Sequence, residues 1–333
     1  MNIHELDILL RTKTRRELYY LEHPGITSPS YQDMQRKVVN GREVLYFKLP
    51  ALKEAEILIR KDSRFTDVPY FVHSNLNMNY IYSGKCDFQI DDRSITLHQG
   101  DVAVFDQDVV RRKLYSNEQD IIVNISMSNE FFSDSFLRRI GNQSLISNFM
   151  LHVLSEHSGS HDHYMVFRSS KNPLITSLFQ QLLLEYYSER VYGKDMIRGY
   201  LHLIFTELLR LYNEYPKEQM IRISADSGET VIHMLQYIEE HYQDCSLNQL
   251  AQEFCYHPKY ATSLLKKLTG SSFKEIQIQE RLKKAAELLL ETEESIQSIC
   301  EQVGISNQSF FYRCFKNIYR MSPKEYRQRK KGG

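Results

Sequence analysis

The sequence predicts a multidomain protein of mixed α and β class: a small β-barrel, then a helical connecting region, then an all-α C-terminal domain with two helix-turn-helix motifs. Three observations lead to this prediction. The chain has 333 residues, more than one domain usually contains. Apolar residues alternate with a period of two between about residues 40 and 130. The last hundred residues contain a diverged internal repeat.

The composition is that of an ordinary globular protein. The chain is 42% hydrophobic and 25% charged with 13 Gly and 8 Pro, which excludes the disordered and collagen-like classes. Lys plus Arg and Asp plus Glu each number 42, so the net charge is zero. No apolar stretch approaches the ~18 residues of a membrane span, and the N-terminus lacks a signal-peptide pattern. We therefore expect a soluble, cytoplasmic protein without a membrane partner.

The five cysteines do not indicate a disulfide framework or a zinc finger. Their number is odd, and no Cys-x-x-Cys pair occurs. Free cysteine behaves as a small apolar residue, so we expect buried thiols. The cysteines are Cys86, Cys245, Cys255, Cys300 and Cys314.

Residues 1–40 are expected to be helical or irregular, and residues 41–130 to form the β domain. Short alternating runs, separated by turn residues such as Ser83-Gly84 and Gln99-Gly100, predict at least six consecutive strands with no helix between them. This pattern is typical of a sandwich or a barrel. The runs are Val44–Phe47, Ile57–Ile59, Tyr80–Tyr82, Cys86–Ile90, Val102–Phe105 and Ile121–Val123.

Residues 131–212 show helical periodicity, with apolar stripes at Phe132–Ile140, Leu174–Tyr187 and Ile197–Leu211. Such stripes suit a protein core or a dimer contact, and both interpretations stay open. The periodicity is lost over residues 213–228, which predicts a linker and a domain boundary.

Four histidines cluster in the connecting region: His152, His157, His161 and His163. Their spacing matches no tetrahedral metal set, so a polar loop is the favoured interpretation. A transition-metal sensor is the alternative.

The internal repeat lies in the predicted C-terminal domain, residues 229–333. Ser246–Phe254 aligns with Ser295–Val303 at an offset of 49, and beyond the turn Tyr260–Leu268 aligns with Phe310–Ile318 at an offset of 50. Each copy indicates a short helix with an N-cap Ser, a tight break and a second helix. The sequence therefore predicts two helix-turn-helix motifs, joined by a helix from about Phe273 to Leu290.

The two predicted turns differ in their residues. In the second copy Gly304 tolerates the positive φ of a sharp turn, and Ser306 is placed to cap the next helix. The first copy has Cys255 and His257 at these places. We therefore expect the first turn to be the more strained.

The second helix of each copy carries polar residues opposite its predicted core, and these can bond base edges or phosphates in a major groove. A solvated helix face selects the same residue types. Two copies on a stiff connector, however, can occupy successive major grooves about 34 Å apart. Eight Lys or Arg against one acidic residue between Arg313 and Lys331 favour phosphate contact. The expected DNA contacts are Lys259, Thr262, Ser263, Lys266, Asn307, Gln308, Tyr312, Arg313 and Lys316.

At these residues the chain closely resembles the AraC family of bacterial transcription regulators. The resemblance covers about residues 229–328, and Cys255, His257 and Arg320 depart from the family pattern. It implies double-stranded promoter DNA as partner, a homodimer and contact with RNA polymerase. The matching residues are Leu250-Ala251, Tyr260–Lys267, Thr269-Gly270, Arg281-Leu282, Val303-Gly304, Phe310-Phe311, Arg313, Phe315-Lys316 and Met321–Arg327.

More weakly, residues 60–130 resemble the cupin-type sensor domain that many family members carry, through Pro69, His73, Tyr82–Gly84 and Leu97–Asp101. An enzymatic cupin supplies histidines and a glutamate as metal ligands. Here the corresponding positions are His73, Asn75 and Asn79, and no histidine lies near Val109–Arg112. We therefore expect no metal and no other cofactor. The expected effector contacts are His73, Asn75, Asn79 and Tyr82.

The sequence thus predicts a sequence-specific DNA-binding transcription regulator, expected to be an activator and not an enzyme. Its N-terminal domain is expected to respond to a small-molecule or peptide effector. One alternative is a metal-dependent cupin enzyme fused to a DNA-binding module. Another is a peptide- or protein-responsive regulator whose front domain offers a surface groove.

Overall fold

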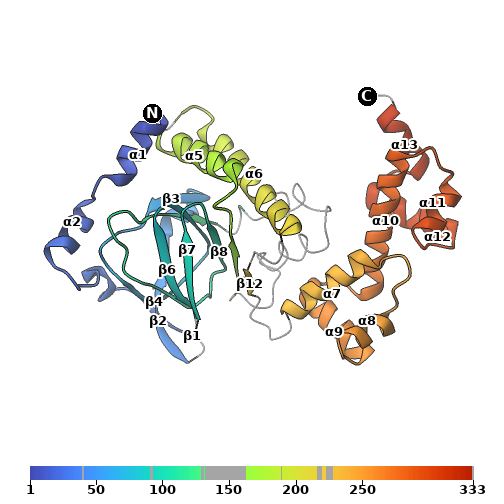
Figure 1. Cartoon of the computed structure of the whole chain (residues 1–333), viewed down its shortest axis with the longest axis horizontal. Helices are drawn as coiled ribbons and strands as arrows, with labels where there is room; N and C mark the ends of the chain where they lie inside the picture. The colour runs from blue at the N-terminus through green and yellow to red at the C-terminus, as the bar shows by residue number, and fades with distance from the viewer. Residues whose placement is uncertain are drawn as a thin grey trace. The chain divides into compact units, whose positions relative to one another are not determined.

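The computed structural model describes residues 1–39, 41–90, 93–128, 131, 163–188, 190–215, 220–222 and 228–331. The chain divides into two compact units. Among the described residues, the first unit ends at Arg222 and the second begins at Gly228 (Figure 1). The division falls inside the segment expected to be a linker.

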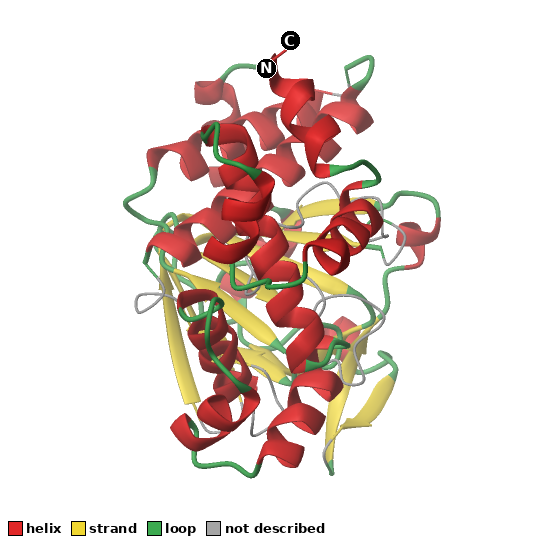
Figure 2. Cartoon of the chain, turned by 90° about the vertical axis from the view of Figure 1, so that its right-hand side faces the viewer, coloured by secondary structure: helices red, strands yellow, loops and turns green. Residues whose placement is uncertain are grey.

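The first unit contains two six-stranded sheets in its described residues. Figure 2 shows strands of this unit in yellow. The first sheet has the order β1-β2-β4-β9-β6-β7 and the second β12-β11-β8-β5-β10-β3. All six predicted strand runs are confirmed. The strands are β1 (Arg36–Val39), β2 (Arg42–Phe47), β3 (Ile57–Lys61), β4 (Val68–His73), β5 (Leu76–Ser83), β6 (Lys85–Ile90), β7 (Arg93–His98), β8 (Val102–Phe105), β9 (Arg111–Lys113), β10 (Ile121–Met127), β11 (Tyr164–Phe167) and β12 (Met220–Arg222).

Side chains from strands of both sheets form one hydrophobic core in the first unit. Because successive side chains of a strand point to opposite faces, Ile81 of β5 lies in this core while Tyr80 lies on the other face. The Tyr80 ring stacks on Phe179, with ring centroids 3.9 Å apart. The core residues are Ile81, Cys86, Phe88, Ile90, Ile95, Leu97, Ala103, Phe105, Val109, Ile122, Tyr164 and Val166.

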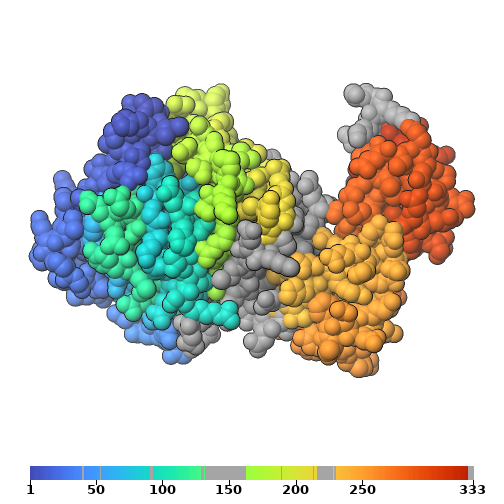
Figure 3. Space-filling view, viewed as in Figure 1, coloured from blue at the N-terminus to red at the C-terminus, as the bar shows by residue number. Residues whose placement is uncertain are grey.

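Helices cover the outside of the first unit. Phe179 belongs to α5 (Pro173–Ser188), which therefore packs on the outer face of the second sheet, and α6 (Gly193–Glu214) packs against α5. Figure 3 shows the N-terminal segment (blue) lying against the strands. This segment contains α1 (Ile3–Arg11), α2 (Arg15–Glu22) and the short 3-10 helix η1 (Pro29–Tyr31); a second one, η2, spans Pro50–Lys53.

The expectation of a wholly helical region over residues 131–212 is wrong at Tyr164–Phe167. These residues form β11, which pairs with β8 and β12. All four side chains are buried, and periodicity alone cannot distinguish so short an apolar run from a piece of helix. Strand β12 lies within the predicted linker. The predicted stripe Phe132–Ile140 and the residues His152, His157 and His161 lie outside the described residues.

A buried ion-pair network holds α2 against the strands. Glu17 is fully buried and accepts hydrogen bonds from Arg64 Nε at 2.7 Å and Lys61 Nζ at 2.9 Å. Arg64 itself is only 1% exposed. Burial by itself would raise the pKa of Glu17. Hydrogen bonds from the Arg64 side chain, the backbone amide of Thr14 and the Lys61 side chain outweigh this effect and lower the pKa to about 2. The carboxylate is therefore charged in the folded state at every ordinary pH.

We expect the first unit to lose stability as the pH falls below about 4.5, the ordinary pKa of Glu17. A carboxyl group whose pKa is lowered by folding stabilises the folded state above its unfolded pKa. That stability is lost as the pH falls from about 4.5 towards 2. Calorimetry of the full chain between pH 7 and pH 3 measures the effect. A Glu17→Gln variant with the same acid dependence as wild type would contradict this assignment.

The second unit is all helical in its described residues. Its elements are α7 (Gly228–Glu240), α8 (Leu247–Glu253), α9 (Pro258–Thr269), α10 (Phe273–Glu291), α11 (Ile296–Gln302), α12 (Gln308–Tyr319) and α13 (Pro323–Lys331). The predicted helix from about Phe273 to Leu290 is confirmed as α10. Within the part of the chain that the structure describes, no helix is both long and apolar enough to span a bilayer.

Candidate nucleic-acid interface

The internal repeat has a direct structural counterpart in the second unit. Helices α8 and α11 have seven residues each, and α9 and α12 have twelve residues each. Their first residues are related by the same offsets that the sequence shows before and after the turn. In each copy the short helix contacts the longer one. Helix α10 connects the two pairs, and α13 follows the second pair as α10 follows the first, so the repeat continues through these helices.

Equivalent hydrogen bonds shape the two copies. The predicted N-caps are confirmed, because the side chain of Ser246 accepts from the Gln249 amide and that of Ser295 from the Ser298 amide. After the short helix, the Tyr256 amide donates to the Ala251 carbonyl at 2.7 Å. The Ile305 amide donates to the Cys300 carbonyl at 2.8 Å. The donor and the acceptor of the second bond each lie 49 residues after those of the first, as Ser295 lies after Ser246. The two copies therefore begin their turns in the same way.

The predicted N-cap of α12 is wrong by one residue. Asn307, not Ser306, caps α12, since its Oδ1 accepts from the Phe310 amide at 2.9 Å. In the first copy His257 caps α9. The offset between these two caps is one position larger than that between the turns, so the additional residue of the second copy lies just before the cap. The side-chain oxygen of Asn307 is therefore engaged within the protein, and only its NH₂ group is free to donate outward.

The first turn is the more strained, as expected. Cys255 has a φ of +56°, and Gly304, its counterpart, has a φ of +74°. A residue with a Cβ pays roughly 1–2 kcal/mol in this conformation, whereas glycine does not. The ends of the longer helices show the opposite arrangement. The first copy has a glycine with positive φ after α9 (Gly270, +74°), whereas the second copy has Arg320 after α12 at φ +60°.

All nine residues expected to contact DNA reach the surface. Thr262 and Tyr312 are half-buried, and Tyr312 also packs edge-on against Phe311. Within the described residues, no hydrogen bond engages the side chains of Thr262, Ser263 or Gln308. The exposed members are Lys259, Ser263, Lys266, Asn307, Gln308, Arg313 and Lys316. The faces opposite them carry the buried residues Ala261, Leu264 and Leu265 of α9, and Phe311 and Phe315 of α12.

Arg281 of α10 connects the two halves of the second unit. Its guanidinium donates to three carbonyl oxygens: Tyr242 at 2.8 Å and Gln243 at 2.6 Å, both after α7, and Gly304 at 2.8 Å in the second turn. Gln243 also donates to the Gln302 carbonyl at 2.9 Å. The sequence marked Arg281 only as part of a resemblance. Its role depends on the carbonyls of two neighbouring residues, Tyr242 and Gln243, and of Gly304, all far from Arg281 in the chain, which no local pattern reveals.

The four residues expected to contact an effector do not form one site. His73, Asn75 and Asn79 are buried, and Asn79 donates to Asn77 at 2.7 Å. Tyr82 lies on the opposite face of β5 from Asn79, because an odd number of positions separates them along the strand. Its hydroxyl donates to Asp7 of α1 at 3.1 Å. Burial, reinforced by Asp7, raises the pKa of Tyr82 to about 12.

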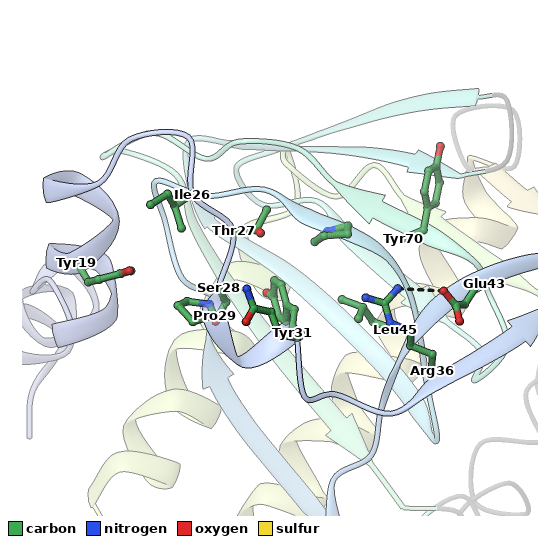
Figure 4. Close-up of a pocket in the computed structure, with 12 residues that line it drawn as sticks. Tyr19, Ile26, Thr27, Ser28, Pro29, Tyr31, Arg36, Glu43, Leu45 and Tyr70 are labelled. Atoms are coloured by element: carbon green, nitrogen blue, oxygen red, sulfur yellow. Dashed lines mark hydrogen bonds and ion pairs between the residues drawn. The ribbon is translucent and has the colours of Figure 1, made fainter.

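Two pockets are lined by described residues of the first unit, and of the four expected effector contacts only Tyr82 lines one of them. One, of about 520 Å³, is lined by Tyr19, Tyr31 and Tyr70, with the ion pair of Arg36 and Glu43 at 3.2 Å (Figure 4). The other, of about 790 Å³, is lined by α1, α5 and Tyr82. In both, the N-terminal segment supplies part of the wall. Across the residues that the structure describes, no group of three or more His, Cys, Asp and Glu side chains is placed to hold a metal ion.

Residues 250–329 match a family described as "Helix-turn-helix domain". The chain is 30% identical over 128 residues to the uncharacterized HTH-type transcriptional regulator YtdP of Bacillus subtilis, covering 36% of this chain and 16% of that protein. It is 35% identical over 95 residues to the regulatory protein PocR of Salmonella typhimurium, covering 28% and 31%. It is 24% identical over 259 residues to the Msm operon regulatory protein of Streptococcus mutans, covering 77% and 85%. The chain thus spans less than a third of the first two relatives.

Proposed function

The C-terminal part of this chain is an AraC-type helix-turn-helix domain, and from that premise we propose that the protein is a sequence-specific DNA-binding transcription regulator. Helices α9 and α12 are its two recognition helices and lie in successive major grooves. One observation carries this proposal: two helix pairs of equal lengths each present an exposed polar face. Helix α10, at 19 residues, is about 28 Å long, close to the ~34 Å of one duplex turn.

The exposed residues divide into two roles. Lys259, Lys266 and Lys316 contact phosphates, which carry no sequence information but supply much of the affinity. Gln308, Arg313, Thr262 and Ser263 contact base edges. Asn307 can donate from its amide nitrogen, while its oxygen caps α12. Tyr312 contributes its hydroxyl from a partly packed ring.

Replacing Gln308 or Arg313 by Ala should relax sequence specificity. Loss of a good base contact costs about 1–3 kcal/mol on the preferred site and little on other sequences. Lys316→Ala should weaken binding to all sequences and reduce the salt dependence by about one unit of slope. Fluorescence anisotropy on a site selected from random duplexes, and on a scrambled duplex, measures both effects. Equal losses on both duplexes for Gln308→Ala would overturn its role in base recognition.

The first unit is the sensor domain of this regulator, with a cupin-like barrel built from its two sheets. It binds a small-molecule or peptide effector, and the difference in effector affinity between two arrangements of the protein shifts DNA binding. The regulator acts in the cytoplasm as a homodimer that activates transcription, contacts RNA polymerase and has no enzymatic activity. A footprint on the promoter next to its own gene tests the target and the half-site spacing together.

A metal-dependent enzyme joined to a DNA-binding domain is the rival function. Metal analysis of the purified full chain separates the two. Less than about 0.1 metal ion per chain leaves no metal-dependent chemistry for the first unit. A stoichiometric metal would favour the enzyme.

A further inference from the structure

Arg111 is a buried cation without an acidic partner among the described residues. Its side chain on β9 is 1% exposed. The other deeply buried cations of the first unit are paired: Arg64 with Glu17, and Lys113 with Asp62 at 3.3 Å. An unpaired ion in a protein interior is costly, because the solvation it loses is not replaced. Arg111 and Lys113 share the nearby carboxylate of Asp62, so together they keep one positive charge that no ion pair among the described residues compensates.

Burial lowers the pKa of Arg111 to about 9, and the nearby carboxylate of Asp62, which already pairs with Lys113, opposes this shift. The groups in direct contact with Arg111 are neutral. Its Nη2 donates to Asn77 Oδ1 at 2.9 Å and its Nη1 to the Val109 carbonyl at 3.3 Å. The guanidinium also lies over the rings of Phe71 and Phe105, 4.6 and 4.2 Å from their centroids. The Nε atom is buried and has no hydrogen-bond partner. Cation–π contacts and two neutral acceptors offset only part of the lost solvation.

His73 packs against Phe71 as Arg111 does, and it has the second buried nitrogen without a hydrogen-bond partner in this region. Its ring packs edge-on against Phe71, with centroids 5.5 Å apart, and stacks on Phe47 at 5.4 Å. Its Nδ1 is buried and has no hydrogen-bond partner. Burial, together with the charges of Arg111 and Arg60, holds the pKa of His73 well below its usual 6.5. The imidazole is therefore neutral, and Nδ1 can serve as a donor without adding charge.

We propose that Arg111 and His73 bind the carboxylate of a small monoanionic effector with an apolar body. Arg111 supplies the charge and the free Nε–H, His73 supplies a second hydrogen bond, and Phe71 and Phe105 contact the apolar part. One uncompensated charge suits a monoanion better than a dianion. This inference rests on the proposed sensor role of the first unit and names the chemical class of its effector.

The test measures thermal unfolding of the full chain with acetate, propionate and benzoate, each paired with its neutral amide. At least one carboxylate should raise the unfolding temperature where its amide does not. Arg111→Met should weaken carboxylate binding by about 30-fold or more, as expected for removing one partner of a buried charge pair. Without ligand, this variant should unfold at the same temperature as wild type or higher, because an uncompensated charge has been removed. A purely structural Arg111 predicts the reverse.

Two further variants keep the test decisive. Arg112→Met removes the neighbouring arginine, which is 38% exposed and paired with Asp67, and should leave the carboxylate response intact. His73→Phe preserves the ring packing but removes Nδ1, and should weaken the response even if Arg111→Met does not fold. The proposal is overturned if no carboxylate stabilises wild type, if both His73→Phe and Arg111→Met respond like wild type, or if phosphate alone stabilises the protein. DNA binding by the same preparation tests the proposed function separately.

Discussion

Gly304→Ala is expected to destabilise the second unit by about 3 kcal/mol or more, at the upper end of the stability losses that single substitutions cause. Gly304 has a φ of +74°, which costs a residue with a Cβ roughly 1–2 kcal/mol. A Cβ built there lies 2.3 Å from the Gln243 carbonyl oxygen and 3.3 Å from the guanidinium carbon of Arg281. Both groups take part in the hydrogen bonds by which Arg281 connects the two halves of the second unit. The backbone must shift, so the Arg281 bonds are lost as well.

Hydrogen exchange of the full chain over residues 296–319, compared with residues 36–127, measures this effect in one sample. Cys255→Gly is the matched control, because it relieves the positive φ at the equivalent turn. It should stabilise the unit by about 1 kcal/mol. A free energy of unfolding for Gly304→Ala within about 0.5 kcal/mol of wild type, the range of an ordinary surface substitution, would show that the close approach to Gln243 is not a constraint.

Glu17→Gln is expected to destabilise the first unit by about 3–5 kcal/mol. The substitution leaves Arg64 and Lys61 without their shared counter-charge at 1% and 9% side-chain exposure. An uncompensated buried charge costs more than the ion pair contributes. Because Glu17 belongs to α2, the N-terminal segment should open first, and amides of residues 15–22 should exchange fastest. Urea unfolding of the full chain gives the size of the effect.

Glu118→Gln is the control for Glu17→Gln. Glu118 also pairs with a lysine, Lys13, but its side chain is 61% exposed. Exposed pairs contribute about 0–1 kcal/mol, so this variant should unfold close to wild type. Similar losses for the two variants would mean that burial does not set the energy of the Glu17 network.

The C-terminal helices were predictable because their signals are local. A Ser cap, a helical period and a repeat of known offset predict that α8, α9, α11 and α12 exist and in what order, although not where each helix ends. The sequence predicted Ser306 as the cap of α12 in place of Asn307, because an alignment can place a one-residue insertion at several equivalent positions. Strand β11 was missed because four buried apolar residues have no diagnostic period.

The groups around Arg111 could not be found in the sequence. They come from β4, β5, β8 and β9 and meet only after strands of two different sheets pack together. Asn79 was singled out by position, but its partner Asn77, which also accepts from Arg111, was not. Tyr82 was assigned to the same site although strand alternation places it on the other face of β5. Burial without a counter-charge is a property of the folded protein alone.

Helices α9 and α12 are alike in length but not in chemistry. Where α9 carries Thr262 and Ser263, α12 carries Tyr312 and Arg313. Under the proposed function, one chain would recognise two unlike half-sequences, so its target would have polarity. Reversing such a target end to end, while keeping every base pair, would turn the bound second unit around on the promoter.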